Sequence, residues 1–104
     1  MSQISWRTLV WRNSHWAIWR RAAQQLALTE PAADITSTLD EYAALLARTG
    51  FHLYEGELHE LRARLAAREG QEAEKVAALH RAYDGYTRFG MTAQAERVAK
   101  EGVV

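Results

Sequence analysis

Three glycines, Gly50, Gly70 and Gly90, divide the second half of the chain at regular intervals. Each follows a run in which apolar residues recur every three or four positions, the spacing of one face of an α-helix. Glycine is common just past the end of a helix because it adopts the left-handed backbone conformation without strain. The chain is therefore expected to fold as short helices that turn back on one another.

Five helical segments are predicted, and the alternation typical of strands is almost absent. They span about residues 5–28, 34–49, 52–69, 71–89 and 92–100. Pro31 closes the first segment, because the residue before a proline is pushed out of helical geometry. Asp34, Thr36 or Ser37 is expected to cap the second segment, and Thr92 the last.

The apolar faces of these segments define the expected core. They contain Ile35, Leu39, Tyr42 and Leu46, then Tyr54, Leu58, Leu61 and Leu65, then Val76, Leu79, Tyr83 and Tyr86, and finally Ala95, Val98 and Ala99. The predicted fold class is all-α, with antiparallel helix pairs that form a fragment of a helical solenoid or a small bundle of about five helices. A Trp- and Arg-rich helix over residues 1–30 precedes a helical domain over residues 31–104, and together they form one compact domain.

The composition limits where the protein acts and what it binds. A chain of 104 residues suits one small domain with a single core. It contains no cysteine, which excludes a disulfide frame and a thiolate metal site and favours a reducing compartment, so we expect the cytoplasm. No run approaches the roughly 20 apolar residues of a membrane span. Thirteen basic residues balance thirteen acidic ones, which gives no overall bias toward nucleic acid or anionic membranes.

The charges are nevertheless distributed unevenly along the chain. Residues 1–29 contain Arg7, Arg12, Arg20 and Arg21 and no acid, so the remainder holds nine basic and thirteen acidic residues. The two parts are expected to attract each other or a neighbouring copy. Contact of the basic helix with nucleic acid or lipid phosphates is the alternative.

Four tryptophans crowd the first helix. Trp6, Trp11, Trp16 and Trp19 lie within fourteen residues. One apolar stripe contains Leu9, Trp16, Ala23 and Leu26, and a second contains Ile4, Trp11, Ile18 and Ala22. A tryptophan buries about 200 Å², so three left in water would expose about 600 Å², the upper end of what a soluble monomer tolerates. The rest of the chain, a second copy, another protein or a membrane surface must cover this helix.

Two stretches resemble a known helical repeat. "LYEGELHELRARLAAREG" followed by "ALHRAYDGYTRFGMTAQAERVAKE" is similar to the carboxy-terminal tetratricopeptide region of large bacterial signalling proteins of the nucleotide-cyclase/ATPase or transcriptional-regulator type. The resemblance covers about residues 35–102 and implies a scaffold that docks other proteins, with a regulatory or signalling role. Through this resemblance, seven residues of the chain correspond to packing and turn positions of the family. They are Ala63, Leu65, Gly70, Leu79, Ala82, Tyr83 and Gly90.

The chain also departs from that family. Lys75 or Val76 stands where the repeat normally has a small residue at the helix crossing. The phosphate-binding motif GxxxxGK[ST] and a pair of metal-binding aspartates in a strand context are missing from the sequence. The catalysis of those larger proteins therefore does not transfer to this chain.

Candidate chemical sites are weak. His52, Glu55 and His59 share one side of a helix and could offer ligands to a metal, but two histidines seven residues apart are about 10 Å apart along the helix axis. Glu55, Glu57 and Glu60 are interpreted as helix-surface charges that face Arg62 and Arg64. The stretch "SWRTLVWRNSHWAIWRR" interleaves aromatic and basic residues, which can stack bases and neutralise phosphates.

We therefore expect a protein–protein interaction module that is not an enzyme and needs no cofactor or metal. It is expected to self-associate through its first helix into a homo-oligomer, with no membrane span and without binding nucleic acid. The residues predicted to contact a partner are Trp6, Trp11, Trp16 and Trp19 in the first helix, and Tyr54, Arg62, Tyr83 and Tyr86 on the concave side of the repeat. A nucleic-acid-binding helical protein and a small metal-binding bundle are the alternatives.

Overall fold

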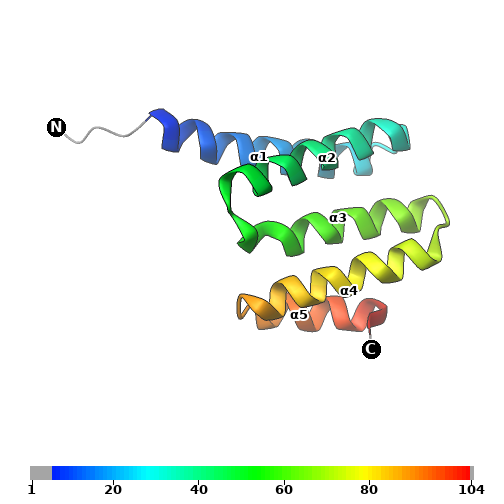
Figure 1. Cartoon of the computed structure of the whole chain (residues 1–104). Coiled ribbons are helices and arrows are strands. Elements are labelled where there is room, and N and C mark those ends of the chain that lie inside the picture. Colours follow the sequence, from blue (N-terminus) through cyan, green and yellow to red (C-terminus); the bar gives the residue numbers. More distant parts are fainter. Residues whose placement is uncertain (1–5, 104) are drawn as a thin grey trace.

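The computed structural model describes the backbone of residues 6–103 and the side chains of residues 16–102. Five α-helices run antiparallel to their neighbours in chain order (Figure 1). They are α1 (Trp6–Ala27), α2 (Ala32–Thr49), α3 (Glu55–Arg68), α4 (Glu72–Arg88) and α5 (Thr92–Val98). A short 3₁₀ turn over His52–Tyr54 precedes α3, and a π-turn over Ala99–Val103 follows α5. The predicted all-α fold of about five helices is confirmed.

Glycines end three of the helices as predicted. Gly50, Gly70 and Gly90 have φ angles of 75°, 71° and 71°, all in the left-handed region. The turn after α1 reaches the same conformation without glycine, since Thr29 has φ 53°.

The predicted helix caps are wrong. Pro31, not Asp34, Thr36 or Ser37, precedes α2, and its carbonyl oxygen accepts hydrogen bonds from the amides of Asp34 and Ile35. Thr92 is the first residue of α5 and not its cap, because the Met91 carbonyl already accepts the amide of Ala95. α2 begins before the predicted cap residues and α5 begins at Thr92 itself, and in both helices the carbonyl of the preceding residue accepts the first helical hydrogen bond.

The core has two parts that share α3. The first joins α1, α2 and the N-terminal half of α3, and it contains Ile18, Ala22, Ile35, Leu39, Tyr42, Leu45, Leu46, Leu58 and Leu61. The second joins α3, α4 and α5 and contains Ala63, Ala78, Leu79, Ala82, Tyr86, Ala95 and Val98. The predicted apolar faces supply most of both, while Tyr54, Leu65 and Tyr83 are only partly buried at their edges.

The helices α3 and α4 approach each other closely at two glycines inside them, Gly56 and Gly85. A Cβ atom at Gly56 would lie 2.7 Å from the ring of Tyr86, and one at Gly85 would lie 3.1 Å from the backbone nitrogen of Gly56. These distances leave no room for a methyl group at Gly56. The absence of both side chains lets Tyr86 pack directly against the backbone of α3.

No helix within the described part of the chain is long and apolar enough to cross a membrane. This agrees with the prediction made from the sequence for that part.

Replacing Gly56 by alanine is expected to destabilise the fold. Alanine is normally favoured over glycine in a helix by about 1 kcal/mol, but overpacking costs about 1–3 kcal/mol, and here the new methyl group would collide with the Tyr86 ring. Urea unfolding should therefore show a lower midpoint for Gly56→Ala. Ala67→Gly, on the exposed side of the same helix, is the control for intrinsic helix propensity. A higher midpoint for Gly56→Ala would contradict the close packing.

Candidate functional site

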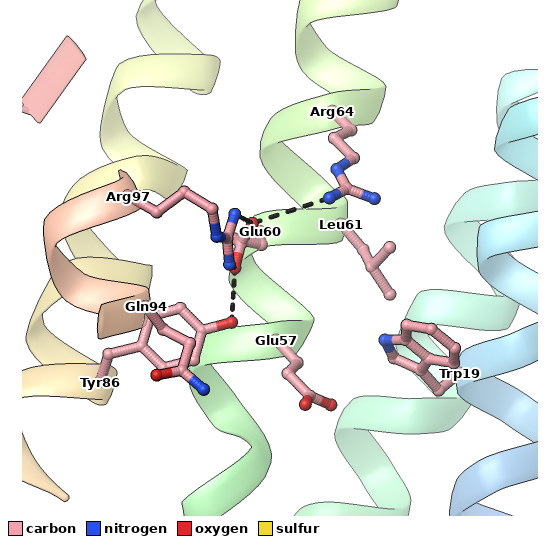
Figure 2. A pocket seen from close by; sticks show the side chains of 8 residues that line it. All are labelled: Trp19, Glu57, Glu60, Leu61, Arg64, Tyr86, Gln94 and Arg97. Carbon is pink, nitrogen blue, oxygen red and sulfur yellow. Dashed lines mark hydrogen bonds and ion pairs between the residues drawn. The ribbon is translucent and has the colours of Figure 1, made fainter. Parts of the chain in front are cut away.

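A polar cavity of about 240 Å³ lies on the face formed by the odd-numbered helices (Figure 2). Its lining comes from α1, α3 and α5, with one side chain from α4 at its base. The lining residues are Trp19, Glu57, Glu60, Leu61, Arg64, Tyr86, Gln94 and Arg97. We call this cavity the groove. The groove brings Trp19 of the tryptophan-rich helix together with residues of α3, α4 and α5.

One end of the groove is fixed by the buried carboxylate of Glu60, which is 6% exposed. Arg97 donates two hydrogen bonds to it, of 2.6 and 2.7 Å, and the Tyr86 hydroxyl donates a third of 2.5 Å. Arg64 lies 3.8 Å away as a looser ion pair. Figure 2 shows these contacts converging on Glu60 from α3, α4 and α5.

The prediction that Glu60 is a helix-surface charge is wrong because Glu60 is buried, although its expected ion pair with Arg64 is present. Burial alone would raise its pKa, but the hydrogen bonds from Arg97 and Tyr86 outweigh burial and leave the pKa of Glu60 below its ordinary value. Burial and the bond to Glu60 raise the pKa of the Tyr86 hydroxyl, which stays protonated as a donor. Glu60 is therefore an ionised structural link between three helices.

The other end of the groove holds a carboxylate that is paired with no cation of the described residues. Glu57 is half-buried, accepts a long hydrogen bond of 3.5 Å from the Tyr42 hydroxyl, and forms no ion pair with any described residue. Burial raises its pKa, the bond from Tyr42 opposes this, and the neighbouring charge of Glu60 raises it further. In Figure 2 the Glu57 side chain points toward the end of the groove where Trp19 lies.

The tryptophan helix is only partly covered by its own chain. Ile18 and Ala22, from one predicted stripe, are buried against α2 and α3. Trp16, from the other stripe, is 56% exposed and stacks on Trp19 with ring centroids 5.3 Å apart. The side chains of Trp6 and Trp11 lie outside the described residues. The rest of the chain therefore buries Ile18 and Ala22, covers Leu26 in part, and leaves Trp16 largely in solvent.

The residues predicted for the concave side do not form one surface. Tyr86 lines the groove but is 2% exposed, so the prediction that it presents its ring to a ligand is wrong. Arg62 binds Asp40 and lines a different cavity, against another face of α3. Tyr54 and Tyr83 are half-buried against the first and second core, respectively. Of the eight predicted partner-binding residues, the groove brings together Trp19 and Tyr86, with Trp16 beside them.

The residues considered for a metal site or for nucleic-acid binding interact with other residues of the chain. His52 Nδ1 lies 2.8 Å from Glu55 Oε1, and in the described part of the chain no three His, Cys, Asp or Glu residues are grouped to hold a metal ion. Burial, together with Arg81 and Arg62, lowers the pKa of His59. In α1, Arg21 forms an ion pair with Glu41 of α2, so its charge is already compensated within the chain.

Two groups of the groove are already committed to contacts within the chain. Both oxygens of Glu60 are occupied by Arg97, which removes it as a general base, and the raised pKa of Tyr86 keeps its proton in place. The groups that remain available are the Glu57 carboxylate, the Trp19 indole, the Gln94 amide and the outer parts of two arginines.

No protein-family model matches the sequence, and no curated protein or solved structure matches it either. The tetratricopeptide resemblance stays a prediction.

The two glutamates of the groove are expected to respond in opposite ways to the same substitution. Glu60→Gln should lower the free energy of unfolding at pH 7 by about 2 kcal/mol, because hydrogen bonds to a charged group are lost. Glu57→Gln should leave it unchanged or raise it, because it removes a half-buried charge without an ion partner. Urea unfolding measures both, and equal losses would contradict this assignment.

Lowering the pH should destabilise the fold by protonating Glu60. Its pKa in the folded chain lies below the unfolded value of about 4.3, so its stabilisation is present above that value and is lost as the pH falls through the folded pKa. Thermal unfolding between pH 6 and 3 should show this loss in the natural chain and a shallower loss in Glu60→Gln. Identical slopes would show that folding does not lower the pKa of Glu60.

Proposed function

We propose that the chain is a protein–protein interaction module, similar in design to tetratricopeptide scaffolds, that associates with a second copy of itself through the outer face of α1. The observation that carries this proposal is the exposure of Trp16, stacked on Trp19 at the edge of the groove. A regulatory role in signalling, as the resemblance implies, belongs to the same proposal.

The exposed tryptophan gives the contact a driving force. About half of Trp16 faces solvent, which is roughly 100 Å² of a side chain that buries about 200 Å². At about 25 cal/mol per Å² its burial is worth about 2.5 kcal/mol in each copy as an upper bound. In a pair related by a twofold axis, both copies contribute the same surface, so Trp16 of each copy is buried in the interface.

The second copy is the occupant that the charges favour. The first 29 residues carry four arginines and no acid, whereas the remainder has a net charge of −4. Each copy therefore offers both a basic helix and an acidic surface. In a pair, the basic helix of each copy can face the acidic surface of the other, so the two copies can balance these charges without another molecule.

Substituting Trp16 should weaken self-association without unfolding the chain. Trp16→Ser should raise the dissociation constant of the pair by about 10- to 100-fold, since 1.4 kcal/mol corresponds to a factor of ten. Sedimentation equilibrium from nanomolar to high micromolar concentration measures the constant. Phe89→Ser is the matched control, because Phe89 is also an exposed aromatic residue, 40% exposed at the end of α4.

The natural chain should have twice the monomer mass at the upper concentrations, and Phe89→Ser should behave like it. A single-chain mass over the whole range would refute self-association. Equal weakening by the two substitutions would show that the contact does not centre on α1.

A further inference from the structure

We propose that in this pair the Arg20 side chain of each copy enters the groove of the other copy and binds Glu57 beside Trp19. The inference rests on the proposed self-association and adds to it the specific charge contact that orients the two chains. It assigns a role to two groups of opposite charge near the tryptophan pair, Arg20 and Glu57, that form no ion pair with any described residue.

The groove has the chemistry to receive a guanidinium group. Glu57 supplies a half-buried carboxylate with no ion pair among the described residues, and the Trp19 indole lines the same cavity. A planar guanidinium can pair with the carboxylate and stack on an indole at once. The cavity of about 240 Å³ is open enough to admit such a side chain.

Arg20 is the arginine that the described part of α1 makes available. It is exposed and forms no hydrogen bond or ion pair with any described residue, whereas its neighbour Arg21 binds Glu41. Arg20 follows Trp16 by four positions, so the two side chains lie next to each other on one face of the helix. A partner that covers Trp16 therefore meets Arg20 as well.

The positions of Trp19, Trp16 and Arg20 along α1 suit a contact between two copies that are related by a twofold axis. Trp19 lies at the groove with Glu57, its stacking partner Trp16 lies further out, and Arg20 adjoins Trp16 on the exposed side. In an isologous interface a residue on one side of the axis meets a different residue on the other side, and the reverse contact occurs symmetrically. Packing Trp16 near the axis brings Arg20 of one copy toward Glu57 of the other, twice.

Charge reversal tests this contact in the full-length chain. Glu57→Arg and Arg20→Glu are prepared separately, and each homodimer then faces two like-charge pairs. In an equimolar mixture of the two variants, both pairs of the mixed dimer have opposite charges again. We expect each variant alone to raise the dissociation constant at least tenfold, and the mixture to return to within about threefold of the natural chain, measured by sedimentation with one variant fluorescently labelled.

Two exposed residues of α4 provide matched controls. Asp84→Arg and Arg88→Glu reverse charges that form no ion pair with any described residue and lie away from the groove. Both should associate like the natural chain, singly and mixed. Restored association in the mixture also shows that the two test variants are folded, because a variant that fails to fold would not be rescued by its counterpart.

The outcomes separate this inference from the proposed function. If Trp16→Ser weakens the pair while Glu57→Arg and Arg20→Glu do not, self-association through α1 stands and the Arg20–Glu57 contact is refuted. If each charge variant weakens the pair but the mixture does not recover, the two residues do not meet and the contact is again refuted. A monomeric natural chain overturns both proposals.

Discussion

The groove depends on one close approach, where the backbone of α3 meets the ring of Tyr86. Gly56 leaves the space for that ring, since a Cβ atom there would lie 2.7 Å from it. Because the ring fits, the Tyr86 hydroxyl reaches Glu60, and Glu60 in turn holds Arg97 with two short hydrogen bonds. These contacts tie Arg97 of α5 to Glu60 of α3, while α5 itself packs on α4 through Ala95 and Val98. They therefore hold the Arg97 side chain at the groove.

The same architecture explains why α1 is both part of the fold and open to a partner. α3 serves two cores, and α1 covers only one edge of the first of them through Ile18 and Ala22. Its remaining tryptophan face has no further helix to pack against within the described structure, and Trp16 stays largely exposed. The described helices therefore present an aromatic side chain next to a carboxylate, and in the proposed pair a second copy covers both.

The fold could be predicted from the sequence much further than the groove could. Helical periodicity and the glycines at 50, 70 and 90 are local signals, so they gave the helices and most of the buried faces. Glu60 was misread because its partners Tyr86 and Arg97 are 26 and 37 residues away, beyond the reach of helix spacing. Gly56 and Gly85 were a usable signal that was missed, since glycines inside helical segments that no turn requires often mark a close crossing.

The most direct test of the account is a measurement of which atoms meet between two copies. Isotope-filtered nuclear Overhauser spectroscopy on a mixture of labelled and unlabelled chains detects only contacts between molecules. The account predicts intermolecular signals from the Trp16 indole to the outer face of α1 in the other copy. Intermolecular signals confined to α2, α4 or α5, or none at concentrations where the sedimented mass is that of a pair, would contradict it.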